Sequence, residues 1–146
     1  MGYYMDQRGS EFRIKRENFA AALAVLVELA GDQHKEQMGG WSCSQGGKCV
    51  EKHYAWVNMD KLKNAKSIEE AMSAWRWQVD IEEGSGDIEY IMFNGEKLGD
   101  DTIMLEAIAP FVEDDSYIEM SGEEGAIWRW TFDNGKFDEK GGTVLW

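Results

Sequence analysis

The residues best suited to bind a soft or borderline metal all lie within one 20-residue window of this chain. Its two histidines and two cysteines follow the spacing H-x8-C-x5-C-x3-H, at His34, Cys43, Cys49 and His53. A structural zinc ion takes four nitrogen or sulfur ligands in tetrahedral geometry, so the window offers one ligand set. The spacing is not one of the common zinc patterns, and free thiols or a disulfide between the cysteines are the alternatives.

The same window could hold a small anionic ligand that resembles a nucleotide. Its glycines at 39, 40, 46 and 47 allow close approach of the backbone to a ligand. Basic groups would contact the anion and aromatic rings would stack on the ligand. Two short W-R-W sequences, 75–77 and 128–130, add one arginine each. The candidate ligand residues are Trp41, Lys48, Lys52, His53, Tyr54, Trp56, Arg76 and Arg129. The alternative is a surface loop without a ligand.

Acidic residues are concentrated in the second half of the chain. The net charge is −13, of which residues 1–66 contribute +2 and residues 67–146 contribute −15. Such a field repels nucleic acid and membrane headgroups and attracts basic protein surfaces or cations. The alternative is a solvated face that keeps the protein in solution. The candidate partner-binding residues are Glu82, Glu83, Asp87, Asp114, Asp115, Glu123 and Glu124.

Length and composition indicate one globular domain. A chain of 146 residues is long enough for a hydrophobic core, and its seven tryptophans argue against disorder. No apolar run approaches the roughly 20 residues needed to span a bilayer. The N-terminal residues lack the basic-then-apolar order of a signal peptide. We therefore expect one cytoplasmic domain, over residues 1–146, in which the thiols are reduced or bind a metal.

Helical periodicity and capping signals predict three main helices. The first begins at Glu17, with apolar residues at helical spacing up to Ala30. A helical turn is expected from Asn58. The sequence Ser67-Ile68-Glu69-Glu70 is a capping box that opens a helix to about Ser73. Asp100 and Asp101 suit the start of the last helix, where carboxylates meet free amides.

Alternation of apolar and polar residues predicts the strands. Turn sequences at 82–87 and 133–136 predict two hairpins. A glycine-rich loop is expected at about 32–52. The expected strands are 12–15, 53–57, 75–81, 88–93, 117–120, 127–132 and 143–146. This order predicts an α+β fold in which an antiparallel or mixed sheet of about 5–7 strands carries three helices mainly on one face.

Several short segments form a pattern that extends over most of the chain. They include the N-terminal Met1-Gly2-Tyr3-Tyr4-Met5-x-Gln7 and the central His53-Tyr54-Ala55-Trp56-Val57. The pattern continues through Trp75-Arg76-Trp77, Gly95–Asp101, Ile118–Glu123 and Trp128–Phe132. Together these segments resemble small uncharacterised proteins of bacteriophage and bacterial genomes. The resemblance implies a phage-like setting and supplies no catalytic residues.

Three functions follow as expectations. The first is a non-enzymatic acidic binding protein that inhibits a host or anti-phage defence protein by mimicking the charge of nucleic acid. Its partner would be a basic protein surface, with no direct contact to nucleic acid or membrane. The second is a protein that binds or sequesters a small nucleotide-like molecule through residues 39–56. The third is an enzyme that uses zinc or a cysteine thiol.

Overall fold

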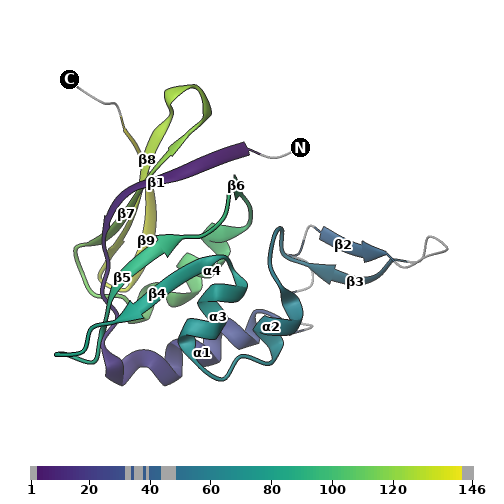
Figure 1. The fold of residues 1–146 in the computed structure, drawn as a ribbon, viewed down its shortest axis with the longest axis horizontal. Coiled ribbons are helices and arrows are strands. Elements are labelled where there is room, and N and C mark those ends of the chain that lie inside the picture. The colour runs from purple at the N-terminus through teal and green to yellow at the C-terminus, as the bar shows by residue number, and fades with distance from the viewer. Residues whose placement is uncertain (1–2, 32–33, 35–37, 39, 44–48, 143–146) are drawn as a thin grey trace.

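Five antiparallel strands form the largest sheet, in the order β6-β1-β7-β8-β9. The computed structural model describes residues 3–31, 34, 38, 40–43 and 49–142, with the backbone alone at 40–43, 49–52 and 142. The β4–β5 hairpin lies beside this sheet, whereas the β2–β3 hairpin lies apart from it (Figure 1). Every pairing among the described strands is antiparallel. The α+β class predicted from the sequence is therefore confirmed.

The strands are β1 (Tyr3–Glu11), β2 (Gly40–Cys43), β3 (Cys49–His53), β4 (Trp77–Ile81), β5 (Ile88–Phe93), β6 (Lys97–Leu98), β7 (Ser116–Gly122), β8 (Ile127–Asp133) and β9 (Lys136–Gly142). The helices are α1 (Phe19–Glu28), α2 (Met59–Lys63), α3 (Ile68–Ala74) and α4 (Asp101–Ile108), with short 3-10 helices η1 (Arg16–Asn18), η3 (Ala109–Phe111) and η4 (Glu123–Gly125). None of the described helices is long and apolar enough to cross a membrane.

Local signals set the ends of two helices. The side chain of Asn58 accepts a hydrogen bond from Lys61 N at 3.1 Å and caps α2. The Ser67 hydroxyl accepts one from Glu70 N at 3.2 Å and caps α3. The Glu70 carboxylate reaches back one residue further than a standard capping box, to Lys66 N at 3.1 Å. Both predicted helix starts are confirmed.

Aromatic side chains build the centre of the core. Trp77 of β4 and Trp130 of β8 are fully buried, and their ring centroids lie 6.1 Å apart. Trp77 also contacts Phe93 of β5 at 4.9 Å. The rings therefore join the β4–β5 hairpin to the five-stranded sheet. Trp77 and Trp130 are therefore core residues, which is the usual role of large aromatic side chains.

Three expected strands differ from the structure. Phe12 and Ile14 are buried, but β1 ends at Glu11, and Ile14 forms only isolated bridges to Ile88 and Val112. The alternation at residues 12–15 reflects the burial of Phe12 and Ile14, and no continuous ladder of strand hydrogen bonds accompanies it. Of residues 53–57 only His53 lies in a strand, because the chain turns at Trp56. β4 begins at Trp77 rather than at residue 75, since Arg76 has a φ of +71°.

The expected loop at 32–52 contains the β2–β3 hairpin, which projects away from the other elements (Figure 1). The sequence there lacks the alternation of a half-buried strand, and so the hairpin was missed. The expected strand at 143–146 lies outside the described residues. β9 nevertheless completes the sheet, and its turn has the predicted form, with φ of +54° at Asn134 and +75° at Gly135.

Gln7 of β1 connects the five-stranded sheet to the β4–β5 hairpin through its side-chain amide. Its Nε2 donates to Ile91 O at 2.9 Å, and its Oε1 accepts from Phe93 N at 2.7 Å. One side chain thus satisfies both a carbonyl and an amide of β5, as a neighbouring strand would. It lies where the pairing of β1 with β7 shifts register, between Gln7 and Gly9.

We expect Gln7→Ala to lower the free energy of unfolding by about 1–2 kcal/mol, because a partly buried donor and acceptor on β5 lose their partners. Urea unfolding would measure the change. Gln78→Ala is the matched control, since Gln78 is exposed on β4. Equal stability of the two variants would show that the amide of Gln7 does not hold the sheets together.

Candidate functional site

An acidic pocket of about 430 Å³ opens between the end of β1, β5 and the segment before β7. Its five carboxylates and one guanidinium give a formal charge of −4. The pocket is lined by Ser10, Glu11, Phe12, Arg13, Glu89, Glu113, Asp114, Asp115 and Ser116. Two predicted partner-binding residues, Asp114 and Asp115, therefore lie in one concave acidic surface.

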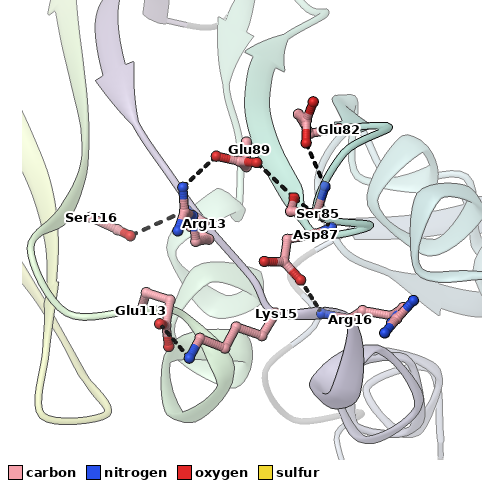
Figure 2. A network of polar contacts seen from close by, with 9 residues as sticks. All are labelled: Arg13, Lys15, Arg16, Glu82, Ser85, Asp87, Glu89, Glu113 and Ser116. Carbon is pink, nitrogen blue, oxygen red and sulfur yellow. Dashed lines mark hydrogen bonds and ion pairs between the residues drawn. The ribbon is translucent and has the colours of Figure 1, made fainter.

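Polar contacts tie this pocket to the β4–β5 turn (Figure 2). Arg13 pairs with Glu89, whose second carboxylate oxygen accepts from the Ser85 hydroxyl at 2.8 Å. Arg16 N donates to Asp87 Oδ1 at 2.9 Å. Glu82 accepts from Ser85 N, and backbone bonds from Gly84 and Ser85 hold the pKa of Glu82 below its usual range. Glu82 and Asp87 therefore belong to the same end of the molecule as the pocket.

The ion pairs of the acidic pocket are open to solvent. The side chains of Arg13 and Glu89 are 50% and 28% exposed. Lys15 Nζ lies 3.5 Å from Glu113 Oε1, and these side chains are 47% and 38% exposed. Pairs of this kind contribute about 0–1 kcal/mol. Their carboxylates can therefore exchange an internal cation for an external one at little cost.

The seven candidate partner-binding acids fall into two groups. Glu82, Glu83 and Asp87 lie in the β4–β5 turn, which Ser85 joins through Glu89 to the pocket that contains Asp114 and Asp115. Glu123 and Glu124 lie in η4, at the opposite end of β7 (Figure 1). There Glu123 Oε1 accepts from Tyr4 N at 3.1 Å. The sequence could not separate the groups, because charge alone does not reveal position.

A second pocket, of about 270 Å³, is lined by Trp56, Arg76, Gly95, Glu96 and Lys97. We call it the aromatic pocket. Trp56 is 53% exposed, although three other tryptophans are at most 1% exposed. The guanidinium carbon of Arg76 lies 5.9 Å from the centroid of the Trp56 ring, within the range of a cation–π contact. Two of the candidate ligand residues therefore meet here.

Arg76 is held from several sides. Its Nη1 donates to Lys97 O at 2.8 Å, and its Nη2 lies 3.2 Å from Asp101 Oδ2. Asp101 is 1% exposed and also accepts from Trp77 Nε1 and Gly99 N, each at 2.9 Å. Burial raises the pKa of Asp101, against the lowering effect of Gly99 and Arg76. Burial likewise lowers the pKa of Arg76, against the opposing effect of Asp101.

Tyr54 and Arg129 lie away from the aromatic pocket. Tyr54 is fully buried and its hydroxyl donates to Leu29 O at 2.8 Å. A buried, bonded hydroxyl offers no surface to a ligand, so we remove Tyr54 from the candidate ligand residues. Arg129 Nε donates to Glu119 at 2.7 Å, and the guanidinium stacks over the ring of Tyr117. Arg129 therefore serves an ion pair on the sheet surface and does not line the aromatic pocket.

The predicted zinc ligands are only partly described. His34 Nε2 lies 3.7 Å from Glu28 Oε1, and His53 Nδ1 lies 3.0 Å from Tyr54 O. The backbone pairs Cys43 with Cys49 at one end of the hairpin and Gly40 with His53 at the other. Strand rise places the Cα atoms of Cys49 and His53 roughly 13 Å apart, which argues against one shared tetrahedral ion.

The side chains of Trp41, Cys43, Cys49 and Lys52, and all of Lys48, lie outside the described residues. Among the residues that are described, no three potential metal-binding side chains form a group. Zinc at this hairpin therefore stays a prediction.

Sequence reasoning missed Lys97 and Asp101 as site residues. Both lie in the segment Gly95-Glu96-Lys97-Leu98-Gly99-Asp100-Asp101, which brings two glycines against Arg76. A Cβ atom at Gly95 would lie 2.9 Å from Arg76 Nη1, and one at Gly99 would lie 2.7 Å from Ala55 O. Gly95 and Gly99, on either side of Lys97, were the signal in the sequence that the backbone of this segment packs closely against another part of the chain.

Comparison with known proteins found no matching family model, no matching curated protein and no matching solved structure.

Proposed function

We propose that this protein is a non-enzymatic binding protein whose acidic pocket engages the basic surface of another protein. The observation that carries the proposal is the concave surface formed by five carboxylates around a single arginine, with ion pairs exposed to solvent. A basic side chain entering this pocket would meet several carboxylates at once. The net charge of −13 would accelerate the encounter, because a strong field steers an oppositely charged partner.

The expected partner is a protein that normally binds nucleic acid. Such proteins present lysines and arginines to a regular series of phosphates, and a carboxylate-rich surface offers similar charge. The phage-like setting implied by the sequence resemblance makes a host or anti-phage defence protein the expected class. Binding would then inhibit that partner by occupying its nucleic-acid site.

The proposal predicts that removing three carboxylates from the pocket weakens partner binding by about tenfold or more, since each lost charge contact contributes some tenths of a kcal/mol to about 1 kcal/mol. The variant is Glu11→Gln, Asp114→Asn and Asp115→Asn, which changes the net charge from −13 to −10. Asparagine keeps the oxygen of residue 114 that accepts from Asn134 N. It also tolerates the φ of +66° at residue 115.

The matched control carries Asp60→Asn, Glu69→Gln and Glu106→Gln, which are exposed on α2, α3 and α4. It has the same net charge of −10 but an intact pocket. Partners would be captured from a bacterial lysate at about 50 mM salt, identified, purified and measured singly, with duplex DNA as competitor. The proposal requires capture that DNA and salt reverse and that the pocket variant loses. Equal binding by both variants, or capture that salt does not affect, would contradict it.

A further inference from the structure

We propose that the aromatic pocket is a binding site for a mononucleotide, with the ring of the base on Trp56 and the phosphate on Lys97. This site lies apart from the acidic pocket and does not depend on the function proposed for it. The inference rests on an exposed tryptophan, a lysine between two aromatic rings and two strained backbone positions.

The conformation of two residues in this pocket is costly. Trp56 and Arg76 have φ values of +66° and +71°, in the left-handed region that bulky side chains rarely adopt. Glycine or asparagine would occupy these turns with less strain. Strained residues cluster at binding sites, where the surrounding structure holds a side chain in a required position. Here both strained residues line the same pocket.

Trp56 leaves about half of its surface open to solvent. At 53% exposed, it does not serve the core as Trp75, Trp77 and Trp130 do. Backbone hydrogen bonds on either side fix the main chain at Trp56. Ala55 N donates to Asp100 Oδ2 at 2.8 Å, and Asn58 N donates to Ala74 O at 3.0 Å. A ring on a fixed main chain, with Arg76 and Lys97 close to it, can stack on a planar ligand without losing much conformational freedom. Base–aromatic stacking is favourable for every nucleobase.

Lys97 supplies the cation for an anionic group. Its Nζ lies 5.0 Å from the centroid of the Tyr4 ring and 5.8 Å from that of Trp56. Among the described residues no carboxylate forms an ion pair with Lys97, whereas Arg76 is already paired with Asp101. Lys97 is therefore the group available for a phosphate, and Arg76 supports the ring of Trp56 from beside it.

The rim of the pocket narrows the class of ligand. Glu96 lines it as a hydrogen-bond acceptor, which suits the amino group or ring N–H of a base. The volume of about 270 Å³ is just below the range of about 300–1,000 Å³ for drug-sized ligands, so a mononucleotide fits better than a dinucleotide. Distant carboxylates oppose the phosphate only weakly, because the Debye length is about 8 Å at physiological ionic strength.

Calorimetric titration with AMP, GMP, CMP and UMP tests the site, with adenosine and inorganic phosphate as separate arms. We expect at least one nucleotide to bind at a 1:1 ratio with a Kd below about 1 mM. Trp56→Ala and Lys97→Gln should each weaken it by about tenfold, whereas Trp56→Phe should retain binding because it keeps a ring. Tyr90→Ala and Lys140→Gln, exposed on β5 and β9, are the matched controls and should not change it.

Absence of saturable binding by all four nucleotides up to about 1 mM would overturn the proposal. So would nucleotide binding that neither Trp56→Ala nor Lys97→Gln weakens, or inorganic phosphate that binds as tightly as the nucleotides. None of these three results would bear on the acidic pocket, because Trp56→Ala should not alter the salt-dependent capture of a basic partner.

Discussion

Replacing Asp101 by alanine is expected to lower the free energy of unfolding by about 3–5 kcal/mol, which is the usual cost of removing one partner from a buried ion pair. Asp101 is 1% exposed, and the side chain of Arg76 is only 17% exposed. The variant would leave the guanidinium without its counter-charge. It would also leave Trp77 Nε1 and Gly99 N without an acceptor, and both bonds are 2.9 Å long in the intact protein.

Urea unfolding at neutral pH would measure this loss, and thermal unfolding should show a fall of about 10 °C. Asp60→Asn is the control, because Asp60 is exposed on α2 and should change stability by less than about 0.5 kcal/mol. Asp101→Asn should fall between the two, since it keeps an oxygen for Trp77 but no charge for Arg76. An alanine variant within about 1 kcal/mol of the unchanged protein would mean that Arg76 finds another partner.

The residue types at this site could be read from the sequence, but their meeting in space could not. Trp56 and Arg76 were both candidate ligand residues, on the basis of their residue types alone. Their meeting depends on α2 and α3, which fold back so that Asn58 N bonds Ala74 O. No periodicity or motif in the sequence predicts that α2 and α3 fold back in this way. Lys97 and Asp101 were missed for the same reason, because their roles exist only after the segment from Gly95 packs against Arg76.

Elements with strong local signals were predictable. The Asn134-Gly135 turn, the β4–β5 hairpin and the caps at Asn58 and Ser67 all follow from the chemistry of a few neighbouring residues. Such signals act within one turn of the chain, and tertiary packing does not override them here.

Alternation of apolar residues was a weaker guide. It predicted one strand from residue 75 to 81, but Trp75 is buried at the end of α3 and only Trp77 begins β4. Two large apolar residues separated by one polar residue can thus be buried on both sides of a bend. The left-handed conformation of Arg76 makes the bend, and arginine carries no preference that would predict it.

Charge patterning showed that the second half of the chain is acidic but not which carboxylates lie together. The pocket gathers acids from β1, β5 and the segment before β7, so it includes Glu11 from the more balanced half. Glu123 and Glu124 looked equivalent to Asp114 and Asp115 in the sequence and lie at the far end of β7. The order of the strands in the sheet, rather than the density of charge along the sequence, therefore determines which carboxylates lie together.

Tyr54 should make the protein lose roughly 2–3 kcal/mol of stability between pH 10 and pH 12. The ring is fully buried against Trp75, with centroids 4.8 Å apart, and the hydroxyl donates to Leu29 O. Burial, and then the charge of Asp100, raises the pKa of Tyr54 to about 12. In the unfolded chain a tyrosine releases its proton near pH 10.

The direction of the effect follows from proton binding. Above pH 10 the unfolded chain has already lost the proton that native Tyr54 still holds, so the unfolded state binds fewer protons and stability falls as pH rises. The contribution is complete below pH 10 and is lost as pH approaches 12. Tyr54→Phe should therefore be less stable by about 1 kcal/mol at pH 7, where its hydrogen bond is missing, yet less sensitive to alkali.

Urea unfolding at pH 7, 10, 11 and 12 would compare three proteins: the unchanged chain, Tyr54→Phe and Tyr90→Phe. Tyr90 is 45% exposed, so its phenylalanine variant should retain the full alkaline loss. Because Tyr54→Phe and Tyr90→Phe each remove one phenol hydroxyl, the difference between their two curves isolates the contribution of Tyr54. A Tyr54→Phe protein that loses as much stability between pH 10 and pH 12 as the unchanged chain would show that the buried hydroxyl does not control alkaline unfolding.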